Sequence, residues 1–275
     1  MQFQLTSDFI AQITQLIAKK DGNALRELLQ DIHFADIAEL IEELNSDQAI
    51  YLVKQLESDL TSEALMELDD DVREKILERL SPKEIAAELQ ELDTDDAADI
   101  IAELDETTQQ KVIDKIEDQE RAADIVELLN YDEDTAGALM AKELVQVKET
   151  WTVAGCVREM RRQAENVTRV HSIYVTNKEG KLTGRLSLKD LLTAEAKTKI
   201  SDVFIPKVDY VTVHTENEEV ARIMRKYDLE AIPVVDQQGI LVGRITIDDI
   251  VDFIKDEAEK DYQMAAGISQ DVEAD

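Results

Sequence analysis

Cysteine, proline, glycine and aromatic residues are all scarce in this chain of 275 residues. It holds one Cys, three Pro, eight Gly and one Trp, and aromatic residues make up 4% of it. A single cysteine excludes an intramolecular disulfide and a cysteine-rich metal site, and it suits a reducing compartment. Cys156 lies in the amphipathic stretch VAGCVREM. In that setting a small buried hydrophobe is a better interpretation than a nucleophile.

Positive charge and long apolar runs are scarce as well. Asp and Glu total 62 against 30 Lys and Arg, which gives a formal charge of −32. Nucleic acid is disfavoured as a partner, because phosphate binding needs a basic patch. No apolar run approaches the roughly 20 residues of a membrane-spanning helix, so the chain itself is expected to be soluble and cytosolic. Divalent cations are natural counter-ions for dense carboxylates, although acidity kept for solubility explains the composition equally well.

An apolar residue recurs every twelve positions through the first half of the chain. The series is Ile32, Leu44, Leu56, Leu68, Leu80, Leu92, Leu104, Ile116 and Leu128. Short amphipathic segments such as SPKEIAAELQEL lie between these positions, and most open with Asp, Ser or Ser-Pro, which begin helices well. Two segments make a helical hairpin, and stacked hairpins bury their apolar faces on one another. The pattern predicts an all-α superhelical solenoid over residues 1–131.

Like charges crowd one of these segments, LDTDDAADIIAEL. Asp95, Asp96 and Asp99 lie at the start of an expected helix. Asp95 and Asp99 are four residues apart, so they share a helix face and repel each other. A solvated helix face is the default explanation for any one of these acids. Otherwise the crowding indicates a site for a positively charged ligand.

The pattern changes after YDEDTAGALM, where short β-branched runs alternate with helical stretches. HSIYVTNKEGKLTGRLSLKDLL matches EAIPVVDQQGILVGRITIDDIV, with an offset of 59 residues throughout. Each copy is expected to form a helix, a strand, a glycine-containing turn, a second strand and a second helix. The sequence therefore predicts an α/β pair of repeated domains at 138–199 and 200–255, followed by a charged helix at 256–275.

The duplicated motif resembles that of tandem CBS domains, the regulatory modules named for cystathionine β-synthase. The stretches GRLSLKD and GRITIDD carry the resemblance. With the twelve-residue repeat in front and YDEDTAGALM at the junction, the chain resembles the cytosolic region of MgtE-type magnesium transporters. The resemblance implies a non-enzymatic region at the cytoplasmic face of the cell membrane that forms a homodimer through its CBS domains. It also implies that residues 256–275 begin a connecting helix to a membrane domain that conducts Mg²⁺.

The resemblance further implies a Mg²⁺ sensor. In this family Mg²⁺ bridges acidic residues of the helical and CBS domains and favours a closed pore. Carried over by position, the implied Mg²⁺ ligands are Asp95, Asp99, Glu63, Gly137 (through its carbonyl), Glu218, Asp228, Asp249, Asp252, Glu257 and Asp261. Arg225 and Lys260 depart from the family pattern, and these departures concern the secondary Mg²⁺ sites more than the central one.

A second functional interpretation concerns the [ST]-x-x-D motif of the CBS copies. In CBS pairs generally, this Asp binds the ribose of an adenine nucleotide such as ATP. The residues implied are Ser187 with Asp190 and Thr246 with Asp249. The same spacing is also a helix N-cap pattern. The alternative function is therefore an adenine-nucleotide-binding CBS module whose acidic helical domain is a scaffold for protein docking. An enzyme carrying CBS domains ranks lower, because the first half has no catalytic constellation.

Overall fold

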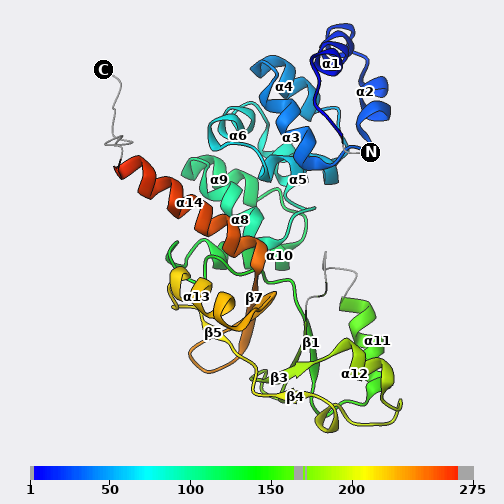
Figure 1. Ribbon diagram of the computed structural model, residues 1–275, viewed down its shortest axis with the longest axis vertical. Helices are drawn as coiled ribbons and strands as arrows, with labels where there is room; N and C mark the ends of the chain where they lie inside the picture. Colours follow the sequence, from blue (N-terminus) through cyan, green and yellow to red (C-terminus); the bar gives the residue numbers. More distant parts are fainter. Residues whose placement is uncertain (1–2, 164–169, 171, 266–275) are drawn as a thin grey trace. The chain divides into compact units, whose positions relative to one another are not determined.

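Short helices joined by tight turns make up the first part of the molecule (Figure 1). The computed structural model describes residues 3–163, 170 and 172–265. The chain divides into two compact units, Met1–Ile125 and Val126–Asp275. The helices up to and across this division are α1 (Ser7–Lys19), α2 (Gly22–Leu29), α3 (Phe34–Glu42), α4 (Ser46–Val53), α5 (Ser58–Met66), α6 (Asp70–Leu77), α7 (Pro82–Glu88), α8 (Thr94–Ala102), α9 (Glu106–Ile113) and α10 (Gln119–Leu128).

Alternate helices of the first unit pack on each other. α3 packs on α5, α5 on α7 and α7 on α9, while α4 packs on α6. In the apolar series of every twelfth residue, Leu68, Leu80, Leu92, Ile116 and Leu128 are buried. Because each helix presents one apolar face, stacking successive hairpins builds a continuous core. The predicted helical solenoid is confirmed.

The second unit contains two similar α/β domains. Its elements are β1 (Val145–Lys148), α11 (Val153–Gln163), β2 (Ile173–Thr176), β3 (Leu182–Leu186), α12 (Leu188–Thr193), the 3-10 helix η2 (Ile200–Asp202), β4 (Ile205–Pro206), β5 (Val211–Thr212), α13 (Asn217–Tyr227), β6 (Ala231–Val235), β7 (Leu241–Thr246) and α14 (Ile247–Ala265). One sheet has the strand order β1-β2-β3-β4 and the other β5-β6-β7. In each sheet the first pair is parallel and the next is antiparallel.

The internal repeat seen in the sequence is a repeat of structure. Val175 pairs with Gly184 in one sheet and Val234 pairs with Gly243 in the other, and an irregularity follows each pair. The turns between the antiparallel strands contain Gly180 and Gly239, which have φ values of +86° and +81°. Such positive φ values favour glycine. The predicted pair of repeated domains is confirmed.

The core of the first repeat contains the single cysteine. Cys156 is fully buried beside Val153 and Ile173, among other apolar residues. Burial raises the pKa of its thiol to about 11, so the thiol is protonated at neutral pH. Its surroundings agree with a packing role.

Helix α14 continues without a break from the end of β7 across residue 256. The sequence placed a domain boundary at that point and another near 131; these bounds stay predictions, and the compact units divide within α10. Among the helices of the described residues, none combines the length and the apolar character needed to cross a bilayer.

Candidate functional site

Helix α8 carries the two acids that the sequence analysis singled out. Asp95 is 7% exposed, whereas Asp99, one turn further along, is exposed. The Oδ1 atom of Asp95 accepts a hydrogen bond from the backbone N–H of Asp96 at 3.1 Å. The spacing correctly predicts one helix for both acids, but it does not predict that their carboxyl groups differ in access to solvent.

Glu63 on α5 lies in an anionic neighbourhood of the same unit. Its pKa is raised, first by burial and then by the charges of Asp93, Glu67 and Asp59, while His33 opposes the shift. Asp93 is the residue immediately before α8. A bound cation would relieve this repulsion, so the surroundings of Glu63 suit a carboxylate that takes part in cation binding.

Three residues around α8 were missed by the sequence reasoning. Arg73 binds Glu103, which follows α8, and Arg121 donates to the carbonyl of Leu92 just before α8. The signal that could have revealed the first contact is a spacing of 30 residues. This spacing separates Arg73 from Glu103, Lys54 from Glu84 and Ser58 from Glu88, and each pair is hydrogen-bonded.

Gly137 is held in the junction segment against the second α/β repeat. Its backbone N–H donates to the carbonyl of Val213 at 2.9 Å, and the N–H of Ala136 donates to that of Thr215 at 2.8 Å. A Cβ atom at position 137 would lie 2.5 Å from Cδ1 of Tyr131. Only glycine fits between this ring and the backbone, which explains the glycine but leaves its role as a Mg²⁺ ligand a prediction.

Two predicted ligands lie at opposite ends of α13. Glu218 is an exposed residue of the first turn, and Asp228 follows the last turn with a left-handed φ of 53°. The backbone N–H of Asp228 donates to the carbonyl of Met224. The helix therefore separates these two carboxylates, which makes a single ion shared by both of them a poor fit.

Asp249 lies in the first turn of α14, and its side chain binds Thr246, the residue that precedes this helix. Its Oδ2 atom accepts hydrogen bonds from both the N–H and the hydroxyl of Thr246, each at 2.7 Å. Burial raises the pKa of Asp249, the bonds from Thr246 oppose this, and Asp248 adds to it. Asp252 is exposed three residues further along, on the same side of the helix.

The equivalent motif of the first repeat behaves differently. Ser187 precedes α12 as Thr246 precedes α14, but its side chain makes no capping hydrogen bond to the helix. Asp190 is half-buried in the first turn. The N-cap alternative is therefore supported in the second repeat, where Asp249 reaches back to Thr246.

The predicted ligands on the later part of α14 are only partly described. Glu257 accepts a hydrogen bond from Nζ of Lys260 at 3.0 Å. The side chain of Asp261 lies outside the described residues. Lys260, one of the two departures from the family pattern, thus supplies a positive charge beside Glu257.

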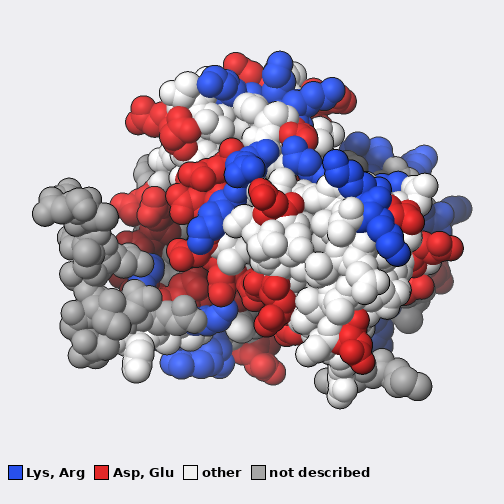
Figure 2. Space-filling model, turned by 90° about the horizontal axis from the view of Figure 1, so that it is seen from above, with Lys and Arg blue, Asp and Glu red and all other residues white. Residues whose placement is uncertain are grey.

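The candidate ligands divide between the two compact units. Glu63, Asp95 and Asp99 belong to the first unit, and the others belong to the second. Within the part of the chain that the structure describes, no three His, Cys, Asp or Glu side chains are grouped as a metal site. Figure 2 shows acidic side chains gathered in groups on the face in view, with basic side chains beside several of them.

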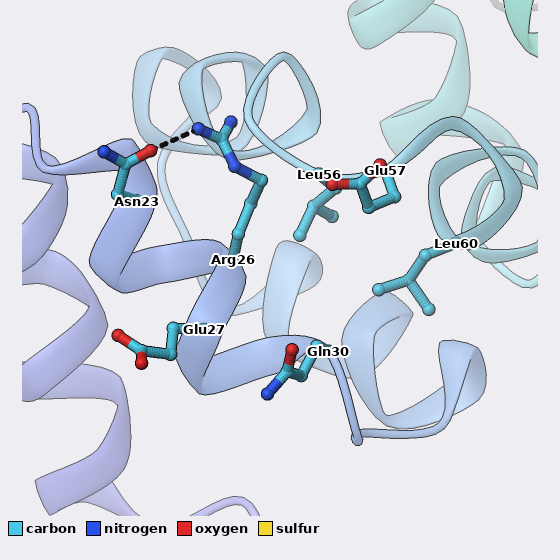
Figure 3. Close-up of a pocket in the computed structure, with 7 residues that line it drawn as sticks. All are labelled: Asn23, Arg26, Glu27, Gln30, Leu56, Glu57 and Leu60. Carbon is cyan, nitrogen blue, oxygen red and sulfur yellow. Dashed lines mark hydrogen bonds between the residues drawn. The ribbon is translucent and has the colours of Figure 1, made fainter.

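A separate pocket of about 360 Å³ lies near the start of the solenoid (Figure 3). It is lined by Asn23, Arg26, Glu27, Gln30, Leu56, Glu57 and Leu60. Arg26 is held in place, because it donates to Oδ1 of Asn23 at 2.6 Å and to the carbonyl of Gln55 at 3.0 Å. None of the predicted site residues lines this pocket, and its side chains of mixed charge match none of the predicted functions.

Comparisons with known proteins cover nearly the whole chain. A family model described as the MgtE intracellular N domain matches residues 32–134, and the CBS domain model matches residues 136–197 and 200–256. The magnesium transporter MgtE of Thermus thermophilus is 43% identical over 141 residues, which are 51% of this chain and 31% of that protein. The chain spans about a third of the length of such relatives.

Two solved structures are similar to the chain over most of its length. The crystal structure of the cytosolic domain of the Mg²⁺ channel MgtE in complex with ATP has a TM-score of 0.83 at 36% identity. The similarity covers 89% of this chain and 99% of that one. The crystal structure of the soluble part of a magnesium transporter has a TM-score of 0.79 at 30% identity, and covers 90% and 98% respectively.

Proposed function

The chain belongs to the MgtE family of magnesium transporters, and we propose that its two units together form a Mg²⁺ sensor that regulates a transporter pore. It consists of the cytosolic-type domains of that family, which is not enzymatic. We further propose that Mg²⁺ bridges acids of the solenoid and of the CBS pair. The transporter's membrane domain and the cytoplasmic face of the membrane are the proposed partner and location.

The observation that carries this proposal is the distribution of carboxylates over both units. α8 in the first unit presents the buried Asp95 and the exposed Asp99, and the start of α14 in the second presents Asp249 and Asp252. Carboxylate oxygens are the ligands that Mg²⁺ prefers, and the ion usually keeps several waters, so two or three protein oxygens suffice. The raised pKa of Glu63 also supports a cation in this region.

Charge repulsion supplies the reverse step of the switch. With a formal charge of −32, acidic surfaces of the two units repel each other when Mg²⁺ is scarce. Mg²⁺ offsets this repulsion in the bridged state only. A differential affinity of about 1–3 kcal/mol for each linked site gives a useful switch. α14 is one continuous helix of 19 residues, and Asp249 lies in its first turn. The helix is therefore suited to transmit the movement caused by Mg²⁺ binding toward a membrane domain.

The test is the effect of Mg²⁺ on molecular dimensions. We expect millimolar Mg²⁺ to reduce the radius of gyration in X-ray scattering and to protect the chain from proteolysis. The double variant Asp95→Asn, Asp99→Asn is expected to lose both effects. The control Glu106→Gln, Asp114→Asn removes the charge of the first residue of α9 and the charge of the residue that follows this helix, and is expected to keep both effects. Scattering profiles of the unaltered chain that superimpose with and without Mg²⁺ would contradict the proposal.

A second candidate function is adenine-nucleotide binding by the CBS pair. It is favoured by the similarity to a cytosolic domain crystallised with ATP and by the paired Thr246 and Asp249. Asp249 belongs to both proposals, whereas Asp190 belongs to the nucleotide proposal only. Calorimetric titration with ATP should therefore compare Asp190→Ala with Asp249→Ala. No heat of binding in the unaltered chain would remove this candidate.

A further inference from the structure

Helix α8 lacks two of the usual restraints on a helix. Asp93 precedes its first turn, but the Asp93 side chain makes no capping hydrogen bond to the helix. In contrast α4, α7 and α9 each begin with such a bond, whereas α5 and α6, like α8, have none. At the other end Glu103 follows the last residue, and an acid there opposes the negative end of the helix dipole. A nine-residue helix of this kind has little stability of its own.

Arg73 restrains the C-terminal end of α8. Its Nε donates to both carboxylate oxygens of Glu103, at 2.9 and 3.1 Å, and its Nη2 donates to Oε1 at 2.6 Å. The same guanidinium donates through Nη1 to the carbonyl of Leu68 at 3.0 Å. Its side chain is 11% exposed, so water competes weakly for these bonds. Arg73 therefore joins the end of α8 to the turn that follows α5.

Arg121 restrains the N-terminal end. From α10, its Nη2 donates to the carbonyl of Leu89 at 2.9 Å and to that of Leu92. These carbonyls belong to the turn between α7 and α8, and Leu92 is two residues before the helix. The turn that delivers Asp95 is thus held by a guanidinium instead of by a side-chain cap.

We infer that Arg73 and Arg121 are positioning residues that hold α8, and with it Asp95 and Asp99, in the geometry that binds Mg²⁺. This inference rests on the proposed function. Arg73 contacts Glu103 and the carbonyl of Leu68, and Arg121 contacts the carbonyls of Leu89 and Leu92. A helix fixed in advance loses less freedom when an ion binds. Residues that orient metal ligands commonly change metal affinity when they are replaced.

Charge alone predicts the opposite effect. Removing a positive charge from an acidic unit strengthens its attraction for Mg²⁺. Positioning instead predicts that Arg73→Gln weakens Mg²⁺ binding, by about tenfold in Kd. The sign of the change therefore separates the two explanations.

The experiment measures Mg²⁺ affinity by calorimetry and amide exchange of residues 94–102 in the absence of Mg²⁺. For Arg73→Gln and Glu103→Gln we expect weaker binding and faster exchange in α8. The double variant is expected to be no worse than Arg73→Gln, because the contact between Arg73 and Glu103 is already lost in that single variant. Arg121→Gln is expected to change both measurements in the same direction.

Arg79→Gln is the matched control. Arg79 follows α6 in the same unit and contacts Asp47 at 3.5 Å, with side chains that are 60% and 87% exposed. It removes the same charge without touching α8, so its Kd should be unchanged or slightly lower. If Arg73→Gln fails to fold, Arg121→Gln carries the same test, because it also removes a positive charge from a contact at the other end of α8.

Two outcomes overturn the inference. One is Mg²⁺ binding by Arg73→Gln or Glu103→Gln that matches the unaltered chain, and the other is unchanged exchange in α8. If the unaltered chain binds no Mg²⁺ through Asp95 and Asp99, the proposed function fails and the role in Mg²⁺ binding fails with it. The exchange measurement still decides whether the arginines hold α8.

Discussion

At the scale of single residues, the fold gives neighbouring side chains of one type different properties. Glu84 and Glu88 lie one turn apart on α7. Hydrogen bonds from Lys54 and from the N–H of Ser81 lower the pKa of Glu84 to about 2. Burial raises the pKa of Glu88, although a hydrogen bond from Ser58 opposes the shift. Folding therefore stabilises the charged form of Glu84 and destabilises the charged form of Glu88.

This contrast predicts opposite effects of pH for two matched variants. Glu84 binds its proton more weakly in the folded state, so its contribution to stability is present above pH 4.5 and is lost as the pH falls toward about 2. Glu84→Gln should therefore be less stable than the unaltered chain at neutral pH, and the difference should vanish in acid. Glu88→Gln should be more stable at neutral pH, and its advantage should shrink as the pH falls toward 4.5. Urea unfolding across this pH range measures both, and equal pH profiles for the two variants would contradict the prediction.

Gly137→Ala tests the packing of the junction segment. The added Cβ would lie 2.5 Å from Cδ1 of Tyr131 and 2.9 Å from the carbonyl oxygen of Val213. We expect a loss of about 1–3 kcal/mol in the free energy of unfolding, because backbone atoms must move. Gly155→Ala in α11 is the control, since its Cβ meets only Oγ1 of Thr152 at 3.5 Å. It should stabilise the helix by about 0.5–1 kcal/mol, and equal effects of the two changes would refute this account.

At the scale of elements, the short solenoid helices depend on their ends and neighbours. α7 has seven residues and α8 has nine, which is too short for either helix to be stable alone in water. Ser81 and Glu84 form a reciprocal capping box at the start of α7, and Pro82 occupies its first position. Contacts between residues about 30 apart then join one hairpin to the next.

Ser81→Ala should remove half of this capping box. The N–H of Glu84 would lose its acceptor, and we expect a loss of about 1 kcal/mol in the free energy of unfolding. Faster amide exchange in the first turn of α7 would locate the effect. Ser46→Ala is a matched control, because the cap of α4 is made by Asn45 and Gln48 instead. A control variant as destabilised as Ser81→Ala would show that the cap is not responsible.

At the scale of the whole molecule, the repeat leaves equivalent apolar residues exposed. Leu188 and Leu192 on α12 are 52% and 73% exposed, and their equivalents Ile247 and Val251 on α14 are 37% and 57% exposed. Four such side chains at matching positions of the two repeats are typical of a surface that another chain covers. They support the proposed homodimer through the CBS domains.

The double variant Leu192→Glu, Val251→Glu should therefore weaken self-association. Placing a charge in each equivalent contact is expected to raise the dimer Kd about tenfold or more, as measured by analytical ultracentrifugation. Tyr210→Glu, at a residue 56% exposed in the same unit but outside the repeated positions, is the control. A monomer at every concentration in the unaltered chain would contradict the proposed dimer.

The sequence by itself determined the division into short helices, the α/β repeat and the family of the chain. These follow from short-range patterns: twelve-residue periodicity, turn glycines and local motifs, which each segment carries within itself. Even so, the same local motif can give different results. The [ST]-x-x-D spacing predicts a capping interaction in both repeats, yet Asp249 binds Thr246 whereas the Ser187 side chain makes no cap.

Only the tertiary structure decided the burial of Asp95, the opposite pKa shifts of Glu84 and Glu88, and the arginines at both ends of α8. The contacts of Glu84 with Lys54, of Glu88 with Ser58 and of the two arginines all join residues about 30 positions apart. The physical reason is that desolvation and charge interactions depend on distance in space. The helical period determines on which face of a helix a residue lies. The packing of one hairpin on the next determines which side chains and how much solvent surround that face.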